Sequence, residues 1–346
     1  MARSHYVPYL LGVDIGSGTA RTAVCRRSSD LVGWGPPEPA PADVPPALGG
    51  LFRRCGDEVP VFTDELFVTP QALLVEQARG AADAVWAREQ EAPDGIALAY
   101  PTSWGPGRLG LLRAALGDAG MSDVVLMTRA RAVVERHRAT GRHPAEGRPV
   151  AVCRIGGLGT EVSLVIPGGP GRLELLAAAE DDEVGGDDLA EGGPVESRAV
   201  LAVVLGLLRR TARTAGVDLG DLSAVLLAGG GTTRPIVAEV LAEAIAAPVL
   251  RDDDPRHTIA CGAAVSLRPA PIPRPTPPPR PFPLLQSTPA GPDAGPAALP
   301  TDLVPVAAEL VTAGPAVAGP AVAGAGPGTP PPRPPLHVAG PEVGRR

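Results

Sequence analysis

The sequence contains no lysine and no asparagine, and aromatic residues make up only 3% of its 346 positions. Without lysine, a positive charge on a phosphate must come from an arginine or a metal ion. The four cysteines, Cys25, Cys55, Cys153 and Cys261, show no Cys-x-x-Cys spacing. This argues against structural disulfides and zinc and fits a reducing cytoplasm. No apolar run reaches membrane-spanning length, and none of signal-peptide length precedes Asp14, so we expect a cytoplasmic protein without a membrane span.

Proline is concentrated late in the chain, with 23 of the 43 prolines in residues 269–346. Such a segment cannot bury enough apolar surface to offset its conformational entropy, and its prolines favour polyproline II. We therefore expect a folded body over 1–268 and a disordered Pro-rich tail over 269–346. The tail is either an unbound linker or a polyproline ligand for an unidentified protein partner.

The expected body is acidic, with 34 acidic residues and 26 arginines, while the whole chain has a net charge of −7. No stripe of arginines offsets this charge. The composition therefore argues against nucleic acid as the main partner.

Hydrophobic patterning predicts strands and helices that alternate along the body, as in α/β domains. The expected strands are 9–14, 21–26, 95–100, 149–153, 160–166 and 224–228, the last being the final strand. The expected helices are 70–91, 108–120, 195–216, 235–247 and 257–267. Irregular structure is expected over 34–60 and an acidic loop over 180–188. Three of the strands end in glycine-rich turns.

The first of these turns follows the apolar run Leu10–Val13 and begins with an acid, Asp14. It contains Gly16, Ser17, Gly18 and Thr19. The glycines let backbone N–H groups approach an anion, and the hydroxyl groups add hydrogen-bond donors. An acid here would repel a bare phosphate, so Asp14 fits best if it holds a hydrated Mg²⁺. On these residues alone, an ordinary β-hairpin turn is an equally open interpretation.

In this order, the turns at 16–19, 156–160 and 229–233 resemble the phosphate and adenosine turns of the superfamily of sugar kinases, actin and heat-shock chaperones. The body is most similar to the nucleotide-binding domain of the seventy-kilodalton, DnaK-type chaperones. The segments that carry the resemblance are Gly12–Thr19, Ala97–Trp104, Gly185–Leu189, Ala228–Pro235, Asp254–Pro255 and Cys261–Val265.

The resemblance implies an α/β, two-lobed actin-like ATPase fold of the ribonuclease-H-like type. Lobe I would span about 8–125, lobe II about 148–250, and a closing helix 257–267. Between Asp188 and Ala224 there is room for about one helix, which implies a reduced lobe-II subdomain.

The resemblance also implies ATP or ADP and Mg²⁺ as cofactors, with Asp14 contacting the metal through water. The nucleotide-binding residues that it implies are Gly16, Ser17, Gly18, Thr19, Gly156, Gly157, Gly159, Thr160, Gly229, Gly230, Gly231, Thr232 and Arg234.

The second turn departs from the family pattern. The family has Asp-Leu-Gly-Gly-Gly-Thr where this chain has Arg154-Ile-Gly-Gly-Leu-Gly, and Arg129 aligns with the glutamate of the family's Asn-Glu-Pro segment. The candidate catalytic acids are thereby reduced to Asp14 and Glu161. Losing a positioned acid or base costs about 10²- to 10⁴-fold in rate. The two arginines can instead neutralise phosphate charge directly.

These observations lead us to expect a DnaK-like, chaperone-related ATP-binding protein with weak or absent hydrolysis. If it is an enzyme, it is a slow ATPase that converts ATP to ADP and phosphate. No β-sandwich that grips peptides is recognisable, so we expect no peptide-binding domain. The alternative is a non-catalytic pseudo-ATPase scaffold that acts through its body surface and its Pro-rich tail.

Overall fold

The computed structural model describes residues 7–28, 33–42, 49–63, 66–142, 144–191 and 193–269. The chain divides into two compact units, Met1–Arg274 and Pro275–Arg346, and all described residues lie in the first. The expected disorder of the tail concerns residues outside the described part, apart from Pro269.

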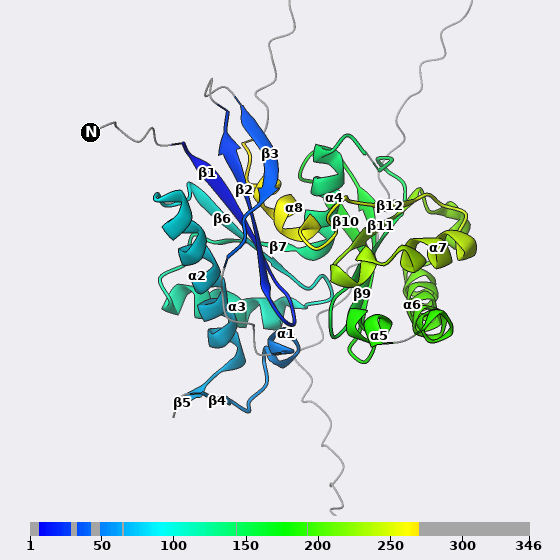
Figure 1. Ribbon diagram of the computed structural model, residues 1–346, viewed down its shortest axis with the longest axis horizontal. Coiled ribbons are helices and arrows are strands. Elements are labelled where there is room, and N and C mark those ends of the chain that lie inside the picture. Colours follow the sequence, from blue (N-terminus) through cyan, green and yellow to red (C-terminus); the bar gives the residue numbers. More distant parts are fainter. Residues whose placement is uncertain are drawn as a thin grey trace, which may run out of the picture. The chain divides into compact units, whose positions relative to one another are not determined.

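Two five-stranded sheets with the same strand order dominate the fold (Figure 1). The first has the order β3 (Trp34–Pro39), β2 (Ala20–Arg27), β1 (Tyr9–Ile15), β6 (Gly95–Tyr100) and β7 (Val125–Thr128). The second has the order β10 (Leu173–Asp181), β9 (Thr160–Pro167), β8 (Val150–Ile155), β11 (Ala224–Ala228) and β12 (Val249–Arg251). In each sheet the first three strands are antiparallel and the last two run parallel to the central one. This α/β architecture with mixed sheets is compatible with the expected two-lobed nucleotide-binding fold.

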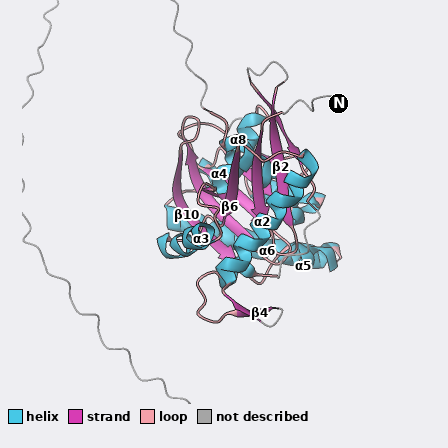
Figure 2. Ribbon diagram, turned by 90° about the vertical axis from the view of Figure 1, so that its left-hand side faces the viewer, coloured by secondary structure: helices cyan, strands magenta, loops and turns pink. Residues whose placement is uncertain are grey.

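Helices separate and cover the two sheets. They are α1 (Leu51–Arg54), α2 (Pro70–Glu89), α3 (Pro106–Asp118), α4 (Arg129–Ala139), α5 (Gly186–Glu191), α6 (Pro194–Ala215), α7 (Pro235–Ala244) and α8 (Thr258–Ser266). Helices α2 and α3 pack on the outer face of the first sheet, α6 and α7 on that of the second, and α4 and α8 lie between the sheets (Figures 1 and 2). Two short 3₁₀ turns, η1 (Leu219–Asp221) and η2 (Gly230–Thr233), flank β11.

The strand sequences explain this layering, because alternate residues feed different cores. On β1, Leu11, Val13 and Ile15 enter the core shared with α2 and α3. The opposite face carries Gly12, where an added Cβ would overlap the backbone of α8 at Ala260. The strand is buried on both faces, as expected for a strand with helices on each side.

The contact between α4 and α8 also depends on a glycine. A Cβ at Gly262 in α8 would overlap the backbone carbonyl of Ala132 in α4. The two helices therefore approach more closely than any larger residue at position 262 would allow.

Three sequence-based expectations are wrong. The stretch 34–60 is not irregular throughout, because Trp34–Pro39 pairs with β2 as an edge strand, where its prolines cost no ladder hydrogen bonds to a further strand. Most of the acidic segment 180–188 lies in β10 and α5, and the strand 224–228 is followed by β12. The sequence analysis also named no element where β7 and α4 lie.

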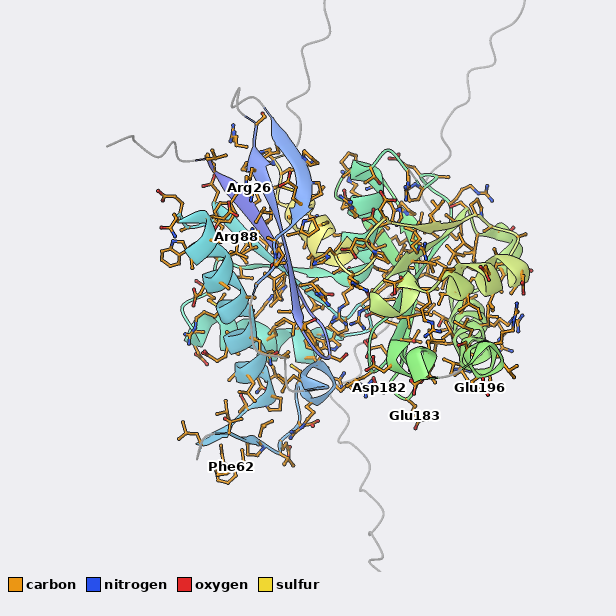
Figure 3. The ribbon with its side chains drawn as sticks, in the orientation of Figure 1. Arg26, Phe62, Arg88, Asp182, Glu183 and Glu196 are labelled. Atoms are coloured by element: carbon orange, nitrogen blue, oxygen red, sulfur yellow. The ribbon has the colours of Figure 1, made fainter. Side chains whose placement is uncertain are left out.

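A small hairpin extends from the first half of the described chain. It consists of β4 (Val61–Thr63) and β5 (Leu66–Val68), and Phe62 points away from the sheets (Figure 3). Phe62 and Phe67 pack against each other with their ring centroids 5.1 Å apart, although both rings are largely exposed.

The four cysteines are free and buried, in line with the prediction that they form no disulfides. Burial raises the pKa of the Cys153 and Cys261 thiols to about 12, which makes them unreactive at neutral pH. No helix within the described ranges is both long enough and apolar enough to cross a membrane.

Candidate functional site

The central strands of the two sheets end in hairpins of the same form. In the first, the Gly16 N–H donates to the Thr19 carbonyl at 2.9 Å, and in the second the Gly156 N–H donates to the Gly159 carbonyl at 2.8 Å. Each central strand ends at an isoleucine that a glycine follows, and the residue before the isoleucine is Asp14 in β1 and Arg154 in β8. Arg154 therefore occupies, in the second sheet, the position that Asp14 occupies in the first.

The charges on the two hairpins are inverted. Asp14 lies opposite Arg21 in the register of β1 and β2, whereas Arg154 lies opposite Glu161 in the register of β8 and β9. Both central residues lie at the same cleft, so the site combines an acid from one sheet with a base from the other.

Glycines join the second hairpin to α5 and to the third turn. The Gly186 N–H donates to the Gly156 carbonyl at 2.6 Å, and the Asp187 N–H donates to the Gly157 carbonyl at 3.0 Å. A Cβ at Gly186 would lie only 2.7 Å from Gly231 Cα, so the two segments touch through backbone atoms. These contacts bring η2 against the second hairpin.

The three turns surround a cleft of about 490 Å³, a volume within the range of about 300–1,000 Å³ usual for ligand pockets. The predicted residues that line it are Asp14, Gly16, Ser17, Gly18, Thr19, Gly156, Gly157, Gly229, Gly230, Gly231 and Arg234. The structure thus brings together turns that lie more than 200 residues apart in the sequence. Their predicted role as nucleotide ligands stays a prediction.

Four predicted residues lie elsewhere. Gly159, Thr160 and Glu161 line a smaller inner cavity of about 60 Å³ next to the cleft, between the two hairpins. The hydroxyl group of Thr160 donates to the Val184 carbonyl at 2.8 Å. Thr232 is fully buried and donates to the Gly229 carbonyl, while its neighbour Thr233 lines the cleft.

Arg129 lies against the acids of the site. It is the first residue of α4 and is only 5% exposed. Its Nε donates to Asp14 Oδ1 at 3.0 Å, and its Nη1 lies 3.5 Å from Glu161 Oε2. Its Nη2 donates to the Ile15 carbonyl at 2.9 Å, and its guanidinium stacks on Phe52 at 4.7 Å from the ring centroid. Burial lowers the pKa of Arg129, but the negative charges of Asp14 and Glu161 outweigh this effect and raise the pKa above its ordinary value.

Glu161 has neighbours on both sides. Its Oε1 accepts the Thr102 N–H at 2.8 Å, and its Oε2 faces Arg129. The side chain is 4% exposed. This acid is therefore held inside the protein by groups from the first half of the described chain.

Arg154 differs from Arg129 because no hydrogen bond or ion pair holds its guanidinium within the described part of the chain. Its Nε is buried without a hydrogen-bond partner, and its guanidinium lies beside Gly156, at the junction of the cleft and the inner cavity. Burial, with a further contribution from the like charge of Arg129, lowers the pKa of Arg154 to about 10.

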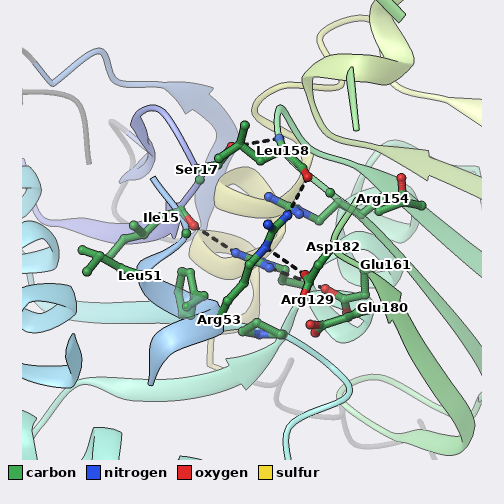
Figure 4. A pocket seen from close by; sticks show the side chains of 16 residues that line it. Ile15, Ser17, Leu51, Arg53, Arg129, Arg154, Leu158, Glu161, Glu180 and Asp182 are labelled. Atoms are coloured by element: carbon green, nitrogen blue, oxygen red, sulfur yellow. Dashed lines mark hydrogen bonds and ion pairs between the residues drawn. The ribbon is translucent and has the colours of Figure 1, made fainter. Parts of the chain in front are cut away.

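Arg53 of α1 crosses from the first hairpin's side to the second (Figure 4). Its Nη2 donates to the Leu158 carbonyl at 2.5 Å, and its Nε lies 2.8 Å from Asp182 Oδ1. The Leu158 N–H in turn donates to Ser17 Oγ at 3.3 Å. These contacts link the two halves across the inner cavity.

Glu180 also lines the inner cavity and accepts a hydrogen bond from the Ser103 hydroxyl. Burial raises its pKa, against the opposing effect of this hydrogen bond. Glu180 is part of the segment expected to be a solvated acidic loop.

The acids of this site do not fit a hydrated Mg²⁺ of the kind expected at Asp14. One Asp14 oxygen already accepts a hydrogen bond from Arg129. Glu161 Oε1 accepts the Thr102 N–H, and its Oε2 lies 3.5 Å from Arg129 Nη1 without a hydrogen bond. The described residues contain no group of three or more side chains able to hold a metal ion. The glycine turns, in contrast, fit a phosphate chain, because they line an open cleft with backbone rather than side chains.

Sequence reasoning missed several residues of the site. Arg21, Gly186, Asp187, Thr233 and Arg256 line the cleft. Asp187 and Gly186 belong to a motif that was recognised but not assigned to the site. No sequence pattern pointed to Arg53, because it lies in the segment 34–60 that was expected to be irregular.

A scan against protein-family models gives no match for the chain. Among curated proteins, it is 39% identical over 66 residues to the chaperone protein HscA homolog of Pseudomonas fluorescens (strain SBW25), which is 19% of this chain and 11% of that protein. It is 30% identical over 115 residues to the chaperone protein HscA homolog of Burkholderia mallei (strain SAVP1), which is 30% of this chain and 18% of that protein. The chain thus matches less than a fifth of the length of these relatives. These partial similarities support a distant relationship to the seventy-kilodalton heat-shock chaperones.

Proposed function

We propose that this chain is a chaperone-related nucleotide-binding protein that holds ATP or ADP in the cleft between the two sheets and hydrolyses ATP slowly or not at all. One observation carries the proposal. The cleft is lined by three glycine turns and by four arginines against two aspartates, in a part of the chain that is otherwise acidic. Backbone N–H groups and arginines are the groups that bind phosphate.

In this proposal, the two hairpins hold the phosphate chain. The backbone and hydroxyl groups of residues 16–19 contact it from one side, and Gly156 and Gly157 from the other. Thr233 and Arg234 line the cleft at the third turn, which contacts the second hairpin segment through Gly186 and Gly231. With the phosphates between the two hairpins, the nucleoside would lie against this third turn.

Slow hydrolysis follows from the position of Arg129. Attack on a phosphate requires an oriented water and an acid or base that handles its proton. The two candidates, Asp14 and Glu161, are both engaged by Arg129. Both carboxylates face the Arg129 guanidinium, and we expect this pairing to hold them away from an attacking water.

The chaperone connection rests on the partial similarity to proteins described as HscA homologs. The alternative is a scaffold that binds no nucleotide. In that case the arginines of the cleft would repel one another without an anion to offset the repulsion, which would destabilise the fold.

Calorimetric titration with ATP and ADP tests the proposal. Gly18 lies at the tip of the first turn and has open space where a Cβ would lie, so Gly18→Val adds bulk in the cleft without a clash in the protein. We expect this variant to weaken binding at least tenfold. Gly169, in the turn between β9 and β10, has equally open surroundings and lies outside the cleft, so Gly169→Val is the matched control. The absence of binding by the wild-type protein at millimolar nucleotide would favour the scaffold.

A further inference from the structure

The cation at the centre of the site lacks an internal counter-ion. Twelve of the described arginine and histidine side chains form ion pairs in the structure or stack on aromatic rings, whereas Arg154 does neither. Its Nε is buried without a hydrogen-bond partner, as are those of Arg131 and Arg268, but of these three arginines only Arg154 lines the cleft. The Arg154 side chain as a whole is partly exposed, but a charge that is partly removed from water and has no ion-pair partner destabilises the fold. The protein therefore contains a positive group whose desolvation an anion from outside can offset.

The acids nearby form no ion pair with Arg154 in the described part of the chain, because each has another partner. Asp14 and Glu161 both pair with Arg129, and Glu180 accepts a hydrogen bond from the Ser103 hydroxyl. The like charge of Arg129 repels Arg154 and contributes to its lowered pKa. The open direction for the Arg154 guanidinium is toward the cleft and the inner cavity, both of which it lines (Figure 4).

Arg154 also lies where a bound phosphate chain would require a positive charge. A phosphate chain between the two hairpins carries several negative charges, which in a metal-dependent site are neutralised by a cation held by acids. Here the residue at the end of β8 supplies a permanent positive charge, and the acid at the end of β1 is already neutralised by Arg129. Arginine binds phosphate oxygens in a bidentate manner and stays charged at all physiological pH values.

We propose that the site binds the phosphates of a nucleotide without a divalent cation, with the Arg154 guanidinium on the phosphate oxygens in place of the metal. This inference rests on the proposed function and narrows it. Arg129 has a different role from Arg154. It forms ion pairs with Asp14 and Glu161 and so neutralises the acids that would otherwise repel the phosphates.

The test is a calorimetric titration of ADP and of ATP into the full chain, once with Mg²⁺ and once with EDTA. We expect dissociation constants that agree within about threefold between the two buffers. Arg154→Gln should weaken binding about 10- to 100-fold in EDTA, the effect of losing charge-assisted hydrogen bonds of about 1.5–3 kcal/mol. Arg198→Gln removes an arginine that forms an exposed ion pair with Glu243 and does not line the cleft, so it should leave binding unchanged.

A second variant separates charge from folding. Arg154→Lys keeps a positive charge and should recover part of the affinity that Arg154→Gln loses, whereas a variant that merely misfolds would show an altered circular dichroism spectrum. Binding that weakens more than tenfold in EDTA but persists in Mg²⁺ would overturn this inference and leave the proposed function standing. Equal affinity of Arg154→Gln and wild type in EDTA would do the same. No binding in either buffer would overturn the proposed function as well.

Discussion

Replacing Arg129 by methionine should strongly destabilise the protein. The change keeps much of the apolar stem and removes the guanidinium that faces Asp14 and Glu161, which are only 5% and 4% exposed. Two buried carboxylates would then lose their ion-pair partner. Removing one partner of a buried ion pair costs about 3–5 kcal/mol, and the lost stacking on Phe52 adds to this cost. We therefore expect Arg129→Met to lower the free energy of unfolding by about 3–5 kcal/mol.

Urea denaturation followed by circular dichroism measures this change. The matched control is Arg198→Met, which removes a solvent-exposed ion pair with Glu243 and should cost less than about 1 kcal/mol. Adding Asp14→Asn to Arg129→Met should restore part of the lost stability, because one uncompensated charge is removed. A cost below about 1 kcal/mol for Arg129→Met, or a further loss in the double variant, would refute the view that Arg129 neutralises these acids.

Three further predictions concern other parts of the fold. Burial lowers the pKa of His137 to about 4, so between about pH 6.5 and pH 4 the unfolded state binds a proton that the folded state does not, and the free energy of unfolding falls as the pH falls. This effect should lower the stability of the wild-type protein by about 2–3 kcal/mol between pH 7 and pH 4.5. Urea denaturation at the two pH values should show that His137→Leu lacks this decrease. Gly262→Ala should lower the free energy of unfolding by several kcal/mol, because its Cβ would overlap the backbone of α4. The control Gly110→Ala, on the exposed face of α3, should raise it by about 0.4–1 kcal/mol. Similar thermal midpoints for the two variants would contradict the close packing of α4 and α8. Arg53→Ala should speed amide hydrogen exchange at Leu158, because Arg53 holds the Leu158 carbonyl while the Leu158 N–H donates to Ser17 Oγ. Unchanged exchange there would show that Arg53 does not hold this residue in place in solution.

The parts of the fold that the sequence predicted best are those set by local pattern. β1 and its turn were expected at 9–14 and 16–19 because an apolar run meets two glycines, and β1 forms at Tyr9–Ile15. Long helices such as α2 and α6 also lie close to their expected bounds, since each repeats apolar residues at helical spacing and begins with a proline in its first turn.

Long-range pairing could not be predicted in the same way. β3 contains three prolines and is a strand only because β2 offers an edge to it. β10 is rich in alanine and glutamate, which favour helices, and its pairing with β9 overrides this preference.

The candidate site shows the same division. The three glycine turns were found from the sequence, and the replacement of two expected acids by Arg129 and Arg154 was visible there. The sequence could not show that these arginines differ. Arg129 pairs with Asp14 across 115 positions of the chain, whereas Arg154 forms no ion pair with any described acid and its Nε has no hydrogen-bond partner. That difference depends on side-chain packing at the meeting point of the two sheets.

The most direct test of the central claim is the stability of the full chain as a function of nucleotide concentration. A ligand that binds only the folded protein raises the free energy of unfolding by RT ln(1 + [L]/Kd), about 2.7 kcal/mol at a hundredfold excess over Kd. We predict that ATP and ADP raise the urea midpoint of the wild-type protein progressively, and that they do so much less for Gly18→Val. A midpoint that stays constant up to millimolar nucleotide, with and without Mg²⁺, would contradict the account.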